Sequence, residues 1–208
     1  MAGKLSNFWY YYRNYVIIGV LLLVTAVAII VLSSGGTEPD IQIGYVTDGR
    51  ELQEQTQEDV NKYFETVIKD VNNDDKKFLG FVPLMGPRVD LEFSSDGAQI
   101  VLVDSNTLQI YKEQGVFEPL DDVAESHGLD VGNNQEVMSK LEGQSDVHIY
   151  ALPTEKIKYL LDLGFPDKDY YLAVRVEYKK NDMSKAKNEN AYSVLEKMFE
   201  YKGVSQNY

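Results

Sequence analysis

The hydrophobic pattern of the chain begins with an unbroken apolar run, Tyr15 to Leu32, in which Thr25 is the only clearly polar side chain. A helix over these residues would measure about 27 Å, close to the thickness of the hydrocarbon core of a bilayer. Aromatic residues precede the run from Phe8 to Tyr12, where a membrane interface would lie. The pattern therefore predicts a transmembrane helix over residues 15–32.

Charges on either side of the apolar run give the helix a direction. Lys4 and Arg13 are the only charged residues before the run, and the first acid after it is Glu38. Because basic residues stay on the cytoplasmic side of a membrane, we expect residues 1–14 in the cytoplasm and the C-terminal part outside the cell. The chain is then a single-pass protein of the cell membrane, in contact with the lipid bilayer through residues 15–32.

A cleaved secretory signal is the alternative, with Val31 and Ser33 as small residues before the cut. The apolar run is longer than the core of a signal peptide, which spans about 7–15 residues, so we expect an uncleaved anchor. Residues 33–39 (SSGGTEP) are typical of a short flexible tether. An extracytoplasmic domain over residues 40–208 follows, within the usual size of one domain.

At the start of the domain, the spacing of apolar residues changes from every second position, as in a strand, to every third or fourth position, as in a helix. Asp40 to Thr47 alternates apolar and polar residues, which predicts a strand. From Thr56 to Val71 apolar residues recur at spacings of three and four, which predicts an amphipathic helix. The polar segment Asp70 to Lys77 is expected to form the turn that ends this helix.

Two short apolar segments follow, Val89 to Phe93 and Gln99 to Val103. Five residues between them are too few for a parallel crossover, so the pattern predicts two strands in a hairpin and hence a mixed sheet. Ser105 is the expected N-cap of a helix that ends at Gly115.

The rest of the domain alternates strands and helices after an irregular stretch from Val116 to Asp146, where we expect one or two short helices. Together with the earlier elements, this order predicts an α/β fold with one three-layer domain and a mixed sheet. The expected elements are a strand at Val147 to Leu152, a helix carrying Ile157, Leu160 and Leu161, a strand at Tyr170 to Tyr178 and a helix at Asn188 to Tyr201.

The charged residues and the lack of cysteine exclude some classes of partner and of chemistry. Without Lys4 and Arg13, 18 basic residues face 33 acidic ones, a net charge of −15 for the exported part. Such a surface repels phosphate backbones, so no nucleic acid partner is expected. The chain has no cysteine, which excludes disulfides and thiolate nucleophiles, and an exported bacterial protein fits this usage.

Three segments resemble bacterial extracellular solute-binding proteins with the type 2 periplasmic-binding-protein-like fold. The segment Gln99 to Asp122 looks like the family's buried strand and helix, followed by a G-x-F-x-P-L-D-D motif, which reads GVFEPLDD in this chain. Val147 to Thr154 (VHIYALPT) and Tyr171 to Arg175 (YLAVR) are similar to later strands of that family. The family holds its ligand between two lobes, whereas this domain has room for about one. The resemblance thus implies one lobe of that fold, here anchored by the predicted transmembrane helix in place of the family's usual cleaved signal or lipid-modified cysteine. Two such lobes in a homodimer would rebuild the cleft.

Ligands of α/β sheets bind outside the carboxyl ends of the strands, where three connections should gather. Their short hydrogen-bonding side chains, next to helix starts, suit a sugar hydroxyl, a peptide or another small polar ligand. The same residue types also cap helices without binding any ligand. The candidate ligand-binding residues are Thr47, Asp48, Gly49, Asp104, Ser105, Asn106, Pro153 and Thr154.

Catalytic and metal-binding patterns are missing from the sequence. The two histidines, His127 and His148, have no zinc-type spacing, and no nucleophile elbow, phosphate-binding loop or dinucleotide motif occurs. Asp70, Asn72 and Asp74 mimic the start of a calcium loop, but Asp75 stands where that loop needs glycine. We therefore expect no enzyme activity, no metal and no cofactor.

Two hypotheses of function remain. The first is a membrane-tethered module that binds or senses a small polar ligand outside the cell. The second is a protein-interaction or assembly domain, with a membrane protein as partner, that has kept the lobe fold without a ligand.

Overall fold

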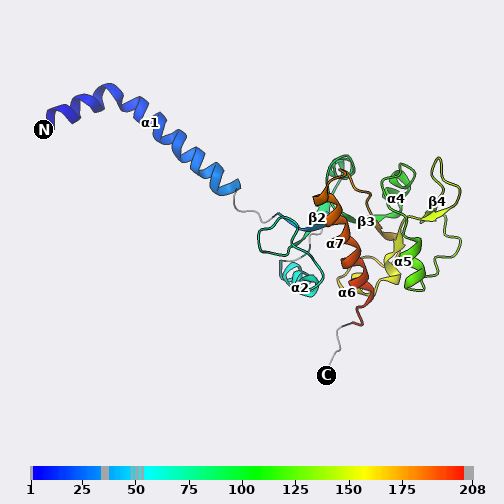
Figure 1. The fold of residues 1–208 in the computed structure, drawn as a ribbon. Helices are drawn as coiled ribbons and strands as arrows, with labels where there is room; N and C mark the ends of the chain where they lie inside the picture. Colours follow the sequence, from blue (N-terminus) through cyan, green and yellow to red (C-terminus); the bar gives the residue numbers. More distant parts are fainter. Residues whose placement is uncertain (1, 34–37, 48, 50–51, 53, 204–208) are drawn as a thin grey trace. The chain divides into compact units, whose positions relative to one another are not determined.

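The computed structural model describes residues 2–33, 38–47, 49, 52 and 54–203. Contacts divide the chain into two compact units, Met1–Glu38 and Pro39–Tyr208 (Figure 1). Most of the predicted tether, residues 34–37, lies outside the described residues. Each unit is therefore described on its own.

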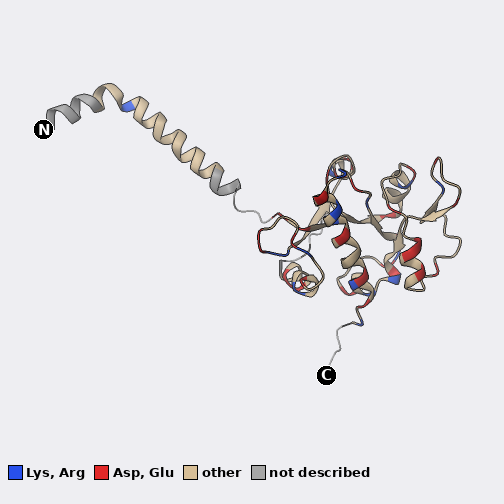
Figure 2. Ribbon diagram, viewed as in Figure 1, with Lys and Arg blue, Asp and Glu red and all other residues tan. Residues whose placement is uncertain are grey.

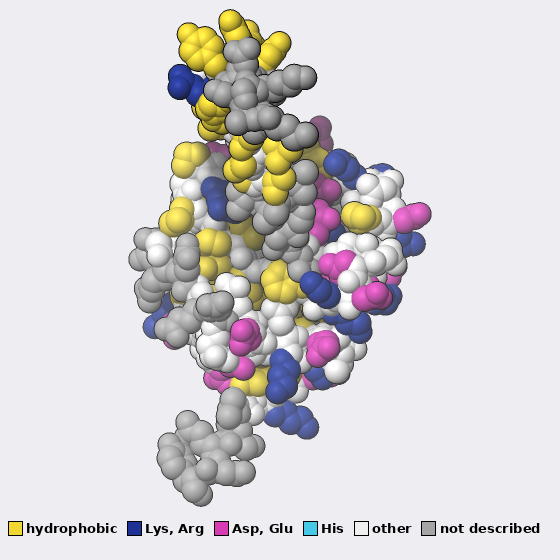
Figure 3. Space-filling view, turned by 90° about the vertical axis from the view of Figure 1, so that its left-hand side faces the viewer, with side chains coloured by type: hydrophobic (Ala, Val, Ile, Leu, Met, Phe, Trp, Pro, Cys, Tyr) yellow, Lys and Arg dark blue, Asp and Glu magenta, His cyan; other side chains and the backbone are white. Residues whose placement is uncertain are grey.

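The first unit is built from helix α1, Ala2–Ser33. Within it, Trp9–Ile29 is long and apolar enough to cross a membrane, with a mean hydropathy of 1.9 and no residue buried within the structure. Arg13 is the one charged residue in that span (Figure 2), and hydrophobic side chains dominate it (Figure 3). The chain thus has one N-terminal apolar helix of the kind that serves as a membrane anchor or as a signal sequence.

The second unit contains a five-stranded mixed sheet in the order β2-β1-β3-β7-β6. The first three strands in this order are parallel, β7 runs antiparallel to β3, and β6 runs antiparallel to β7. A mixed sheet was expected, and the structure confirms it. Its strands are β1 (Ile41–Val46), β2 (Leu79–Leu84), β3 (Ile100–Asp104), β6 (Leu152–Pro153) and β7 (Tyr170–Val174).

Helices cover both faces of this sheet, because the strands are apolar on both sides. One core joins Ile41, Ile43 and Ile100 to α2, α6 and α7. The other joins Val101 and Val103 to α3 and α4. The helices are α2 (Glu54–Phe64), α3 (Pro87–Phe93), α4 (Ser105–Lys112), α5 (Asp121–Ser126), α6 (Lys158–Asp162) and α7 (Asp182–Phe199), with a 3-10 turn at Thr154–Lys156 and a small second sheet of β4 (Met138–Ser139) and β5 (His148–Ile149).

The predicted hairpin is wrong. Val89 to Phe93 is not a strand but the body of α3, which starts at Pro87, a residue favoured in the first turn of a helix. The alternation of V-D-L-E-F fits a helix as well as a strand over so few residues. The sheet is mixed because of β7 and β6 instead, and the sequence reading missed β2, whose Leu79–Leu84 pairs with β1.

Several predicted boundaries also shift. Helix α2 ends at Phe64 rather than near Val71, although Ile68 is still buried in the core. Strand β7 ends at Val174, and Arg175 forms an isolated bridge to Phe117. Helix α7 begins at Asp182, earlier than expected, and the strand predicted from Val147 to Leu152 splits into β5 and β6.

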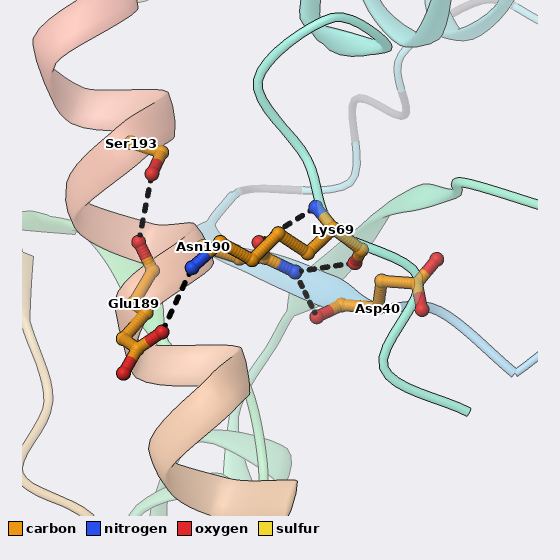
Figure 4. A network of polar contacts seen from close by, with 5 residues as sticks. All are labelled: Asp40, Lys69, Glu189, Asn190 and Ser193. Atoms are coloured by element: carbon orange, nitrogen blue, oxygen red, sulfur yellow. Dashed lines mark hydrogen bonds and ion pairs between the residues drawn. The ribbon is translucent and has the colours of Figure 1, made fainter. Parts of the chain in front are cut away.

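The edge of the sheet where β1 and β3 begin, here called the amino edge, is closed by a buried polar network (Figure 4). The carboxylate of Asp40 accepts from the backbone N–H groups of Val71 (2.7 Å) and Phe78 (2.9 Å). The Asn190 amide accepts from the N–H of Lys69 (2.9 Å) and donates to the carbonyl oxygens of Lys69 (2.9 Å) and Asp40 (3.3 Å). The network thus ties the start of β1 to α7 and to the segment after α2.

Candidate functional site

The opposite edge, here called the carboxyl edge, is where β1, β2 and β3 end. Because β6 runs antiparallel to β7, it also ends there, and β7 begins there. The three predicted connections, residues 47–49, 104–106 and 153–154, therefore leave the sheet at one edge. Asp48 lies outside the described residues.

A hollow of about 660 Å³ opens at the carboxyl edge. Two of the predicted residues, Thr47 and Asp104, line it. The rest of the lining consists of aromatic rings, aliphatic side chains and further polar groups. The aromatic ones are Tyr45, Phe165 and Tyr170, and the further polar ones are Thr56, Lys168 and Asp169.

The three aromatic rings form one wall. The Tyr45 and Phe165 rings meet edge to face with centroids 5.8 Å apart, and the Phe165 and Tyr170 rings lie nearly parallel at 6.2 Å. Tyr45 and Tyr170 are buried, and Phe165 is half-buried. The wall is thus fixed by packing before any ligand arrives, and a fixed aromatic wall can take the apolar face of a small molecule.

The hydroxyl of Tyr170 is held in place by β1. It donates to the carbonyl oxygen of Val46 at 2.6 Å. Burial raises the pKa of this hydroxyl well above its ordinary value, and the nearby Asp104 and Tyr45 add to the shift. The phenol therefore stays neutral and remains a donor at any physiological pH.

Asp104 ends β3 and caps helix α4. Its carboxylate accepts from the backbone N–H of Thr107 at 2.8 Å and from the Thr107 hydroxyl at 3.2 Å. Ser105, the predicted N-cap, is instead the first helical residue, so that prediction was wrong by one position. A carboxylate oxygen accepts more than one hydrogen bond, so Asp104 can cap the helix and still face a ligand.

Thr47 and Gly49 form the start of the β1–α2 connection. The N–H of Thr47 donates to the carbonyl oxygen of Leu84 (3.1 Å), which extends the pairing of β1 with β2. The N–H of Gly49 donates to the Thr47 hydroxyl (3.3 Å). Gly49 has a φ of 117°, which an L side chain rarely adopts, so glycine is needed for this turn.

The remaining predicted residues support the rim of the hollow rather than line it. Ser105 donates its backbone N–H to the carbonyl oxygen of Asp169 (2.9 Å), and Asn106 is exposed on α4. Thr154, next to Pro153, is fully buried, and its hydroxyl donates to the carbonyl oxygens of Pro166 and Tyr170. These bonds hold the loop between α6 and β7. A direct ligand contact by these four residues stays a prediction.

The loop between α6 and β7 supplies groups that the sequence reading did not assign to the site. Phe165, Lys168 and Asp169 all line the hollow. Asp169 has a φ of 54°, in the left-handed region that aspartate tolerates better than most residues. The polar run Asp167 to Asp169 is visible in the sequence, but such a run marks a solvated turn as readily as a site.

Both histidines contact carboxylates away from the hollow. His127 Nε2 lies 2.8 Å from Glu196, and His148 Nδ1 lies 3.0 Å from Asp121. Each ring also packs on an aromatic neighbour. Among the described residues, no three histidine, aspartate or glutamate side chains are grouped closely enough to hold a metal ion.

No protein-family model and no curated protein matches the chain. A solved structure of a cyclo/maltodextrin-binding protein complexed with maltotetraose is similar at a TM-score of 0.35 and 15% identity, over 58% of this chain and 29% of that one. Another, a complex with acarbose, has a TM-score of 0.35 and 18% identity, over 57% of this chain and 30% of that one. The resemblance to solute-binding proteins therefore stays a prediction.

Proposed function

We propose that the chain is a membrane-anchored, extracytoplasmic and non-catalytic module that binds a small polar ligand in the hollow at the carboxyl edge. Helix α1 spans the membrane through residues 15–32, with the N-terminus in the cytoplasm. The charge asymmetry around its apolar span supports this orientation. The module stays at one place on the membrane and does not shuttle a solute.

The hollow itself carries the proposal. Its volume of about 660 Å³ is in the usual range for small-molecule sites, roughly 300–1,000 Å³. A wall of rings lies beside the hydrogen-bonding groups of Thr47, Asp104 and Lys168. This mixture suits a ligand with an apolar face and polar substituents, such as a sugar, an amino acid or a short peptide.

The chemistry of the lining favours binding over catalysis. No histidine, the most frequent general acid or base of enzymes, is among the described residues that line the hollow. Asp104 is already engaged by Thr107. Binding of a ligand needs only that these hydrogen-bonding groups and rings are held in place.

A thermal-shift screen tests the proposal. The full chain in lipid nanodiscs is heated with sugars, amino acids and short peptides. A ligand at 100 times its Kd stabilises the native state by about 2.7 kcal/mol, which raises Tm by about 5–10 °C. Failure of every compound to raise Tm would count against binding.

Two variants make the screen specific. Asp104→Asn keeps an acceptor for the N-cap of α4 and removes the charge, so it should lower Tm little and reduce the ligand-induced rise. Asn181→Ala removes the cap of α7, where Asn181 accepts from the N–H of Ser184 (2.8 Å). It should lower Tm by itself and leave the ligand-induced rise unchanged.

An assembly domain is the second candidate, and exposed apolar residues on α3 and α4 favour it. Leu91 on α3 and Ile110 on α4 are exposed by 67% and 53%. The two helices contact each other through the stacked rings of Phe93 and Tyr111, 4.1 Å apart. Loss of a co-purifying membrane protein, or of a homodimer, in the double variant Leu91→Ser with Ile110→Ser would favour assembly over ligand binding.

A further inference from the structure

A second hollow of about 660 Å³ adjoins the first, and Thr56 and Leu163 line both. One wall is helix α2, which contributes Thr56, Asp59, Val60 and Tyr63. The spacing of these residues, three, four and seven positions apart, places them on one face of the helix. The other wall is α6, beside α2 in Figure 1. The two hollows therefore form one groove that runs along α2 and opens at the carboxyl edge.

Tyrosine rings close the far end of this groove. The Tyr63 ring of α2 stacks on the Tyr159 ring of α6, with centroids 5.1 Å apart and planes 16° apart. The Tyr201 ring meets both edge to face, at 5.8 and 5.0 Å. The same cluster already attracts an ammonium group, because Lys197 Nζ lies 5.6 Å from the centroid of the Tyr63 ring.

Each wall also carries an exposed carboxylate. Asp59 lies on α2 and Asp162 on α6, and neither has a hydrogen bond or an ion pair among the described residues. Lys158, the basic residue of this lining, donates from Nζ to the carbonyl oxygen of Lys202 at 3.2 Å. Two acids facing one space beside tyrosine rings provide a setting for a cation.

We propose that the groove between α2 and α6 binds the ammonium end of a linear organic amine, whose other end lies in the hollow at the carboxyl edge. This inference rests on the proposed function and gives its ligand a chemical class. The wall from Thr56 to Tyr63 covers about 10 Å along the axis of α2, so the ligand is a chain rather than a compact molecule. The strongly acidic domain steers such a cation toward the groove.

Calorimetry with three matched probes tests the amine. The full chain in phosphatidylcholine nanodiscs is titrated with 1,6-diaminohexane, 6-amino-1-hexanol and 1,6-hexanediol. Affinity should fall in that order, and diamine binding should weaken with added salt because the attraction is between charges. Equal affinity for the diamine and the diol, or no diamine binding, would overturn the inference.

Isosteric variants locate the ammonium. Asp59→Asn and Asp162→Asn should each weaken diamine binding roughly threefold to fivefold, as expected for one exposed charge pair. Glu58→Gln is the matched control, because Glu58 is exposed on the same helix outside the lining and loses the same charge. An equal loss in Glu58→Gln would mean that only the overall field acts, and the inference would fail.

The variants also separate this inference from the proposed function. If a sugar or peptide binds and Asp104→Asn weakens it while Asp59→Asn does not, the hollow at the carboxyl edge is a site and the amine is the wrong class. If no sugar, amino acid, peptide or amine binds, both proposals fail together.

Discussion

The two edges of the large sheet are built in opposite ways. At the amino edge, the buried side chains of Asp40 and Asn190 satisfy backbone groups, and the hollow beside Arg175 measures only about 20 Å³. At the carboxyl edge, rings and short polar groups surround a space of about 660 Å³. One edge is thus filled by side chains that hold the fold together, and the other keeps open space beside aromatic and polar groups. Substitutions at the two edges should therefore affect different measurements.

Arg175, which directly follows β7, is a further buried polar residue at the amino edge. This residue is only 6% exposed, and its guanidinium donates to the carbonyl oxygens of Ser95 (3.0 Å), Ala98 (3.3 Å) and Phe93 (3.5 Å). Burial lowers the pKa of this group, although an arginine stays charged in proteins. These bonds fix the turn between α3 and β3, which lies at the end of β3 away from Asp104.

The largest effect is expected for Asp40→Ala. The substitution removes a buried carboxylate and leaves the half-buried N–H groups of Val71 and Phe78 without their acceptor, which should lower the free energy of unfolding by about 3 kcal/mol. Urea unfolding of the full chain, followed by tyrosine circular dichroism, measures it. Asp70→Ala is the control, because Asp70 also accepts two backbone N–H groups but in an exposed turn, and it should cost less than about 1 kcal/mol. Equal losses at the two positions would remove the distinction.

A smaller effect is expected at the carboxyl edge for Tyr170→Phe. At pH 7 it should cost about 1 kcal/mol, since the carbonyl oxygen of Val46 loses its donor. The folded pKa of Tyr170 lies above the ordinary value of 10.0, so its contribution is complete below pH 10 and is lost as pH rises through the folded pKa. Urea unfolding at several pH values should show the gap between wild type and Tyr170→Phe narrowing above pH 10. A constant gap would contradict this assignment.

The sequence predicts the strands that are buried and apolar. Prediction fails where the apolar spacing of a short segment fits both a strand and a helix. β1, β3 and the first half of the last strand are found because their residues point into two cores. Val89 to Phe93 is misread because its alternation also suits one face of a short helix, and only Pro87 indicates the helix. β2 is missed because Gly80 and Pro83 are poor strand formers, although β2 is an edge strand of the sheet, where proline is tolerated.

The candidate site is predicted in part for a similar reason. Thr47 and Asp104 come directly after two strands that the sequence predicts. Because ligands of α/β sheets bind outside the carboxyl ends of strands, this position identifies both residues as candidates, and both line the hollow. Phe165, Lys168 and Asp169 precede β7, whose antiparallel direction brings its beginning to the same edge. That direction depends on pairing between distant segments, which one sequence does not reveal.

An NMR titration of the full chain in nanodiscs tests the central claim most directly. The compounds of the screen, together with 1,6-diaminohexane, are added to isotope-labelled protein, and backbone shifts are followed at both edges. The account predicts perturbations at Thr47, Asp104 and Tyr170, and none at Asp40 or Arg175. Perturbations confined to Asp40 and Arg175, or none with any compound, would contradict it.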